Sequence, residues 1–257
     1  MSNPSLQEDR SCICLFNFFH TEGGDVYTNI IQGRGPLVLS VPHDGATILP
    51  GITRRTSTKP RDLGTLPLAM SLRHELGCLG EDSTLVWFDL HRSQVDPNET
   101  DRARACVPGL EREFDAYHES LDYAVETALT YFGRCLLLDI HRCSLPEGPD
   151  MILGSDQHRA SPRSLDLALA QNLRQNFSVA FSPDPARGID RRYRGGWIVR
   201  RAAKQFGTRG LDAVQLELND ALWRLPQRPL AHHLATALVQ TISPRSTTTH
   251  NEKQAPL

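Results

Sequence analysis

The chain has 257 residues, 39% hydrophobic and 23% charged, and its 28 basic and 30 acidic side chains give a formal net charge of −2. This composition excludes a disordered chain, and the near-balance of charge argues against a surface built for nucleic acid or anionic membrane. The longest apolar stretch near the start, residues 13–19, is interrupted by Asn17 and is far shorter than the roughly 20 residues of a membrane span.

Short apolar runs rich in β-branched residues predict strands, and longer segments with a 3.6-residue period predict helices. In chain order we expect strands at 26–31 and 37–41, a helix at 66–76, a strand at 84–90, a helix at 110–132, a strand at 135–140, a helix at 164–175, a strand at 179–181, a helix at 197–206, a strand at 213–218 and a helix at 229–242. This alternation predicts an α/β fold, a three-layer αβα sandwich with a mixed, mostly parallel central sheet.

The body of the chain shows no internal linker, so we expect a single domain over residues 12–242. The polar ends, residues 1–11 and 243–257, read as flexible tails. The six cysteines are scattered without a CxxC pair, and the first ten residues do not resemble a secretory signal, which favours a reducing, cytoplasmic location. A metal pair at Cys12 and Cys14 is a weaker alternative to two ordinary strand residues.

Arginine dominates the basic residues, since Lys59, Lys204 and Lys253 are the only lysines. Codon usage explains this as readily as a need for guanidinium groups that bind carboxylates. Six arginines fall in residues 187–201 together with Tyr193 and Trp197. This segment reads as a solvated loop, a nucleic-acid patch or a site for a small anion, and the charge balance favours the small anion.

Histidines stand where predicted strands end. His43 follows strand 37–41, His91 follows strand 84–90, and His141 follows strand 135–140. Ligands bind beyond the carboxyl ends of strands in such sheets, and two imidazoles with a carboxylate form a hydrolytic zinc site. A structural hydrogen-bonding role is the alternative for each histidine.

Four carboxylates compete for roles beside these histidines. Asp44 and Asp62 are candidate third ligands, whereas Asp139 shares a strand face with His141 and suits a partner that orients the imidazole. Glu217 lies in an otherwise apolar strand, where a carboxylate is costly unless it is paired or used. It is therefore either the partner of an arginine or a general base.

A series of short motifs resembles the N-formylglutamate amidohydrolase family. The resemblance starts with PLVLSVPHDG at 36–45 and continues in order through Asp62, residues 91–98, Tyr117-His118, residues 137–141, residues 150–154, residues 195–198 and residues 215–217. It covers about residues 26–223. It implies a zinc-dependent enzyme with a zinc exopeptidase-like fold, related to carboxypeptidase A and succinylglutamate desuccinylase.

The resemblance implies one zinc ion per chain, held by His43, Asp62 and His141, although such a nitrogen and oxygen site accepts other divalent ions. Glu217 corresponds to the base that activates water. The implied substrate-binding residues are Arg92, Asn98, Arg102, His118 and Gly196.

One departure from the family pattern concerns the substrate. The family usually has arginine directly after the asparagine, and this sequence has Glu99 after Asn98. Either Arg102 or Arg104 substitutes from the next turn, or the substrate differs.

The sequence therefore predicts a metal-dependent hydrolase of the amide bond in a small N-acyl amino acid, with N-formyl-L-glutamate as the substrate implied by resemblance. A carboxypeptidase-like peptidase, a deacylase of another amino acid, and a metal-free binding protein with the same fold are the alternatives. The expected partner is a small carboxylate, with no nucleic acid and no membrane. The oligomeric state stays open.

Overall fold

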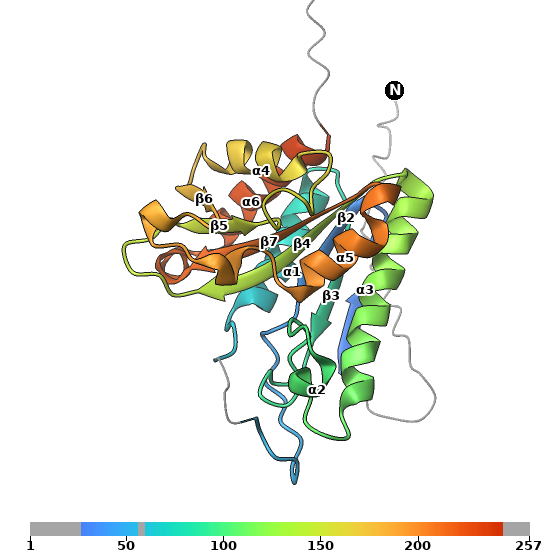
Figure 1. Cartoon of the computed structure of the whole chain (residues 1–257). Coiled ribbons are helices and arrows are strands. Elements are labelled where there is room, and N and C mark those ends of the chain that lie inside the picture. The colour runs from blue at the N-terminus through green and yellow to red at the C-terminus, as the bar shows by residue number, and fades with distance from the viewer. Residues whose placement is uncertain (1–26, 56–59, 244–257) are drawn as a thin grey trace, which may run out of the picture.

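The computed structural model describes residues 27–55 and 60–243 of the chain (Figure 1). The strands are β1 (Thr28–Ile31), β2 (Leu37–Val41), β3 (Ser83–Phe88), β4 (Cys135–Cys143), β5 (Met151–Gly154), β6 (Val179–Phe181) and β7 (Leu211–Asn219). The α-helices are α1 (Thr65–Cys78), α2 (Arg102–Ala105), α3 (Glu111–Phe132), α4 (Leu165–Leu173), α5 (Trp197–Phe206) and α6 (Gln227–Ile242). Single 3₁₀ turns cover Pro185–Arg187, Arg191–Tyr193, Gly207–Arg209 and Asp220–Arg224.

The strands form one sheet in the order β1-β3-β2-β4-β7-β5-β6. The central strands β3, β2, β4 and β7 are mutually parallel, and β5 is parallel to β6. Antiparallel pairing occurs between β1 and β3 and between β5 and β7. The predicted mixed, mostly parallel sheet is confirmed.

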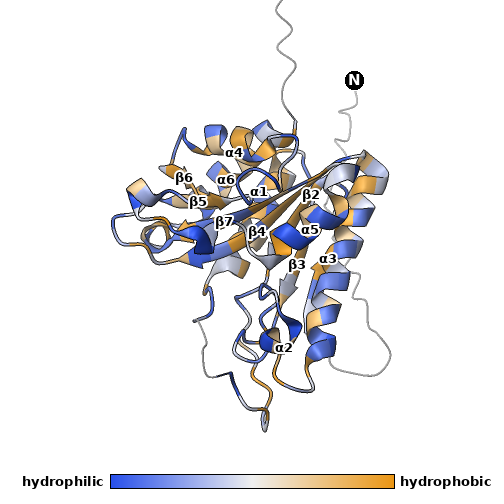
Figure 2. Ribbon diagram, in the orientation of Figure 1, coloured by the Kyte–Doolittle hydropathy of each residue, from blue (hydrophilic) through white to orange (hydrophobic). Residues whose placement is uncertain are grey.

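Helices cover both faces of the sheet, which confirms the three layers. One core lies between the sheet and α1, α4 and α6, and a second lies between the sheet and α3 and α5. In Figure 1, α5 and α3 lie on the side of the sheet nearer the viewer. The central strands are coloured as largely hydrophobic in Figure 2, as expected for strands buried on both faces.

Side-chain alternation along β4 decides which face carries the polar residues. Leu136, Leu138 and Ile140 pack toward α1 and α6, whereas Leu137 packs toward α3 and α5. Side chains two residues apart share a face, so the later odd-numbered positions of β4 point to the α3 side. Polar residues therefore gather on that face where the strands end.

Most of the predicted elements are present, with two additions and two extensions. The four-residue strand β5 and the single-turn helix α2 were not expected. Strands β4 and β7 continue beyond their predicted ends, because their parallel pairing extends to Cys143 and Asn219. The proposed tail 1–11, residues 244–257 of the proposed tail 243–257, and the Cys12–Cys14 pair lie outside the described residues.

No helix in residues 27–55 and 60–243 is both long and apolar enough to cross a membrane.

Gly45 fixes how the chain leaves β2. A Cβ at this buried position would lie 2.4 Å from the Leu90 carbonyl oxygen and 2.5 Å from the Asp89 carbonyl carbon. Backbone hydrogen bonds join the same two segments, from Thr47 N to Asp89 O at 2.9 Å and from His91 N to Thr47 O at 2.8 Å. The backbone crossing therefore has no room for a side chain.

We expect Gly45→Ala to lower the free energy of unfolding by roughly 2 kcal/mol, because the added methyl group forces two backbone segments apart. Urea unfolding followed by circular dichroism measures this change. Gly77→Ala, at an exposed position of α1 with no atom within 4 Å of the new methyl group, is the matched control and should be neutral or slightly stabilising. Equal unfolding midpoints for the two variants would contradict the expectation.

Candidate metal centre and active site

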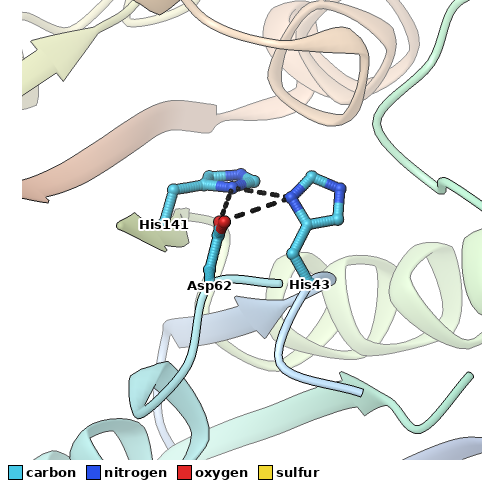
Figure 3. A group of neighbouring side chains, drawn as sticks. All are labelled: His43, Asp62 and His141. Carbon is cyan, nitrogen blue, oxygen red and sulfur yellow. Dashed lines mark hydrogen bonds and ion pairs between the residues drawn. The ribbon is translucent and has the colours of Figure 1, made fainter. Parts of the chain in front are cut away.

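Three ligand atoms converge where β2 and β4 end. His43 Nδ1 lies 3.1 Å from His141 Nδ1 and 3.4 Å from Asp62 Oδ2, and His141 Nδ1 lies 3.0 Å from the same Asp62 oxygen. Figure 3 shows the two rings and the carboxylate pointing toward one another. All three residues are buried, and together they form the metal-ligand cluster.

The spacing of these atoms suits a small divalent ion. Zinc binds histidine nitrogen and carboxylate oxygen at about 2.0–2.2 Å with tetrahedral geometry, which places ligand atoms about 3.3–3.5 Å apart. The three observed separations lie close to that range. The cluster therefore fits a tetrahedral ion with one position left for another ligand.

The outer nitrogens of both imidazoles face carboxylates. His43 Nε2 lies 2.8 Å from Asp96 Oδ1, and His141 Nε2 lies 2.9 Å from Asp139 Oδ2. A proton on each Nε2 satisfies the carboxylate and leaves the Nδ1 lone pair free to bind a metal. The predicted placement of Asp139 beside His141 is observed, whereas no role was assigned to Asp96 from the sequence.

A second layer of hydrogen bonds holds Asp139. Ser40 Oγ donates to Asp139 Oδ1 at 2.6 Å, so the Tyr117 hydroxyl, 2.8 Å from Ser40 Oγ, donates to the serine. All three side chains are fully buried. The orientation of the His141 ring is thus tied to β2 and α3.

Asp62 reaches the cluster because a neighbouring aspartate anchors the start of α1. The Asp44 carboxylate accepts hydrogen bonds from the backbone N–H groups of Gly64 and Leu66, at 3.1 and 2.8 Å. The Asp62 N–H donates to the His43 carbonyl at 2.9 Å. Asp44, the other candidate third ligand, therefore serves as a helix cap and leaves Asp62 beside the histidines.

The electrostatics of the centre favour a cation. Burial raises the pKa of Asp62, but hydrogen bonds from His141 and His43 outweigh it and hold that pKa well below the usual range. Burial lowers the pKa of His141, but Asp139 and Asp62 outweigh it and hold that pKa well above the usual range. An ion of charge +2 would take over the positive charge that the imidazoles otherwise supply.

Arg92 ties two of the carboxylates together. Its Nη2 donates to Asp96 Oδ2 at 2.9 Å, and its Nη1 lies 3.5 Å from Asp62 Oδ1. The side chain is 8% exposed. Arg92 lines the cavity, but its two guanidinium contacts hold Asp96 and Asp62 beside the metal-ligand cluster.

Glu217 stands beside His141 on the neighbouring strand. The two residues are paired in the register of β4 and β7, and both line the same cavity. Gln215 Nε2 donates to Glu217 Oε1 at 2.5 Å, and no described arginine pairs with this glutamate. Burial raises the pKa of Glu217 despite the opposing charge of His141.

The cluster opens into a cavity of about 1610 Å³. His43, Asp62, His141 and Glu217 lie among its lining residues, together with nine arginines. Asn98 and Gly196 line it as well. The cavity thus combines a buried carboxylate and imidazole centre with a strongly basic wall.

Asn98 and Gly196 fit together at the start of α5. Asn98 Oδ1 accepts a hydrogen bond from Ile198 N at 3.0 Å, and its Nδ2 lies 3.3 Å from His141 Nε2. A Cβ at position 196 would lie 2.2 Å from the Asn98 side chain. The Gly196 N–H donates to Gln215 Oε1. These contacts connect α5 to His141 and Glu217.

The structure does not bring Arg102 and His118 to the cavity. Arg102 is exposed and donates through Nε to Asp115 Oδ1 at 2.9 Å. His118 is buried inside the α3 layer, where its ring packs edge-on against Phe114 with centroids 4.5 Å apart. The family resemblance suggested His118, and the departure from the family pattern at Glu99 suggested Arg102. The Arg102 side chain instead bonds to Asp115 of α3, and that of His118 lies in the core.

The comparisons with known proteins confirm the predicted family resemblance. The model of the family described as N-formylglutamate amidohydrolase matches residues 106–224, which include His141 and Glu217 and begin after His43 and Asp62. The match indicates a hydrolase that acts on amide bonds. No curated protein sequence matches the chain.

Two solved structures share the fold. N-formylglutamate amidohydrolase from Ralstonia eutropha JMP134 is 15% identical, with a TM-score of 0.65 over 84% of this chain and 97% of that one. Gene product Atu2144 from Agrobacterium tumefaciens is 16% identical, with a TM-score of 0.62 over 85% of this chain and 94% of that one. At these identities the likeness concerns the fold alone.

His118 generates a prediction about stability. Burial, aided by the charge of Arg201, lowers the pKa of His118 to about 4. The unfolded chain binds a proton near pH 6.5, so the folded protein loses stability as the pH falls from about 6.5 to 4, by roughly 3 kcal/mol in total. His118→Phe should remove this component.

Urea unfolding of the wild type and His118→Phe at pH 7 and pH 5, with a chelator present throughout, measures the difference. The chelator removes any contribution from metal release. We expect the wild type to lose roughly 2 kcal/mol more than the variant between these two values. Parallel losses in the two proteins would show that His118 does not stay neutral in the fold.

Proposed function

We propose that this relative of the N-formylglutamate amidohydrolases is a zinc-dependent amidohydrolase acting on a small N-acyl amino acid. The observation that carries the proposal is the convergence of His43 Nδ1, Asp62 Oδ2 and His141 Nδ1 at the floor of a large cavity, with Glu217 beside them. N-formyl-L-glutamate is the first substrate to test, because the family resemblance suggests it.

The metal-ligand cluster has the donors and the hydrogen-bonded outer nitrogens that a catalytic zinc site needs. When bound there, zinc supplies Lewis acidity toward water and toward an amide carbonyl. With three protein ligands, the ion would have a further position for water or substrate, and all three ligand residues line the cavity. The buried Asp139 and the partly exposed Asp96 keep both imidazoles aimed at the centre of the metal-ligand cluster.

Glu217 is the proton carrier in this proposal. It accepts a proton from water as water attacks the carbonyl carbon, and it delivers that proton to the amide nitrogen as the carbon–nitrogen bond breaks. Its Oε1 is occupied by Gln215, so Oε2 is the oxygen available for the transfer. The products are a carboxylic acid and an amine, and the glutamate returns to its starting state.

The neighbouring polar groups keep this arrangement in place. Gln215 connects Glu217 to the Gly196 N–H at the start of α5, and Asn98 holds the next turn of that helix through Ile198 N. Arg92 fixes Asp62 and Asp96 relative to each other. Position 196 needs glycine for this arrangement, because a Cβ there would collide with the Asn98 side chain.

The test is zinc content and activity in the wild type, His141→Ala and Glu217→Gln, purified without a histidine tag. We expect about one zinc per wild-type chain, a loss of zinc in His141→Ala, and retention of zinc in Glu217→Gln. Glu217→Gln should lower kcat for N-formyl-L-glutamate by a factor on the order of 10²–10⁴, because the proton carrier is removed.

His232→Ala is the matched control. This half-exposed histidine pairs with Glu75, at 3.0 Å, far along the chain from the metal-ligand cluster. It should keep both zinc and activity. A wild-type protein that takes up no zinc even after incubation with the ion would refute the proposal and favour a metal-free binding protein.

A further inference from the structure

Glu99 leaves the site without a cation where the family resemblance places one. Its Oε1 accepts from Arg104 Nη2 at 2.7 Å and from the backbone N–H of Thr100 at 2.9 Å. Glu99 and Arg104 thus neutralise each other at the cavity wall. A substrate carboxylate needs a different guanidinium.

Most arginines of the cavity already have partners. Arg92 bonds to Asp96, Arg142 to Asp220 and Arg192 to Asp190. Arg55 donates to the carbonyl oxygens of Arg92 and Arg104. These side chains shape the wall and have few donors left for a ligand.

Among the described residues that line the cavity, Arg54, Arg191 and Arg200 have no carboxylate within 4 Å. Arg54 and Arg191 are exposed, so water compensates their charge. Arg200 is half-buried, and the one hydrogen bond of its side chain goes from Nε to the Gly196 carbonyl at 3.3 Å. A half-buried guanidinium with no counter-charge is costly until an anion binds it.

Arg200 is connected to the reacting end of the cavity through its contact with Gly196. The Nε–Gly196 bond turns the side chain back along α5 to the first turn of the helix. Gly196 is joined through Gln215 to Glu217. The adjacent Arg201 faces the other way, toward α3, where it pairs with Asp122 through two bonds of 2.6 Å.

We propose that Arg200 binds a carboxylate of the N-acyl amino acid substrate. The two Nη atoms are free to hold a carboxylate in a bidentate arrangement. This inference rests on the proposed function, because it assigns a substrate contact within that same site. The residue that binds the substrate carboxylate then lies on α5, and not in the loop that contains Glu99.

The kinetic test compares three substrates in the wild type and Arg200→Gln. N-formyl-L-glutamate carries both carboxylates, N-formyl-L-glutamine carries only the α-carboxylate, and N-formyl-L-isoglutamine carries only the side-chain carboxylate. Arg200→Gln should raise KM on the order of tenfold to a hundredfold for every substrate that has the bound carboxylate, with kcat changed far less. The substrate without it identifies which carboxylate Arg200 holds.

Two variants serve as controls. Arg200→Lys keeps the charge but loses the fork, so it should recover only part of the affinity. Arg191→Gln removes an exposed cavity arginine and should leave KM within about twofold, since water already compensates its charge. Thermal unfolding confirms that Arg200→Gln remains folded. Equal KM values for Arg200→Gln and the wild type would overturn the assignment of Arg200 and leave the amidohydrolase proposal standing.

A binding measurement separates the two proposals if none of the three substrates is hydrolysed. Calorimetric titration of the zinc-loaded wild type with L-glutamate, the expected product, should show binding that weakens at least tenfold in Arg200→Gln. Zinc loading and this difference without hydrolysis would overturn the proposed reaction but support Arg200. No detectable binding to the wild type would overturn the carboxylate assignment.

Discussion

The pairing of each ligand histidine with a carboxylate is the constraint on which the rest of the site depends. Asp96 and Asp139 each bind the outer nitrogen of one imidazole, so the two Nδ1 atoms, 3.1 Å apart, are the ring atoms left to bind a metal ion. Without a metal ion, hydrogen bonds from the imidazoles to Asp62 hold these atoms together, and a bound cation would take the place of the shared protons. Elements as distant as the β2 serine, the α3 tyrosine and Arg92 serve this arrangement by fixing the two carboxylates.

The parallel sheet makes the arrangement possible. Strands β2, β4 and β7 lie side by side with their carboxyl ends together, and register sets Ser40 beside Asp139, and His141 beside Glu217. Along each strand, side chains two residues apart share the face that α3 and α5 cover. Polar residues at the carboxyl ends of these otherwise apolar strands therefore place the ligand, its orienting carboxylate and the proton carrier close together.

The sequence predicts those parts of the site that strand periodicity determines, and fails where a loop or helix surface decides. His43, His141, Asp139 and Glu217 follow from strand ends, whereas Asp62 required a family resemblance because the Asp44 cap that positions it is a tertiary contact. Arg102 looked like a substitute cation but lies on the turn that faces Asp115. The sequence could not single out Arg200, because it is one of six arginines in residues 187–201. The structure distinguishes it from Arg192 and Arg201, which pair with carboxylates.

Charge is separated within the cavity in a way that orients a substrate. Asp62, Asp96, Asp139 and Glu217 concentrate carboxylates around the metal-ligand cluster, while the walls carry guanidinium groups. An anionic substrate is attracted to the walls, so its carboxylate is held there and its uncharged amide is the part that approaches the cluster. Glu99 stands where the family has an arginine, and the proposed carboxylate contact is Arg200 on α5. The distance between Arg200 and the metal-ligand cluster therefore sets how far the substrate carboxylate lies from the bond that is cleaved.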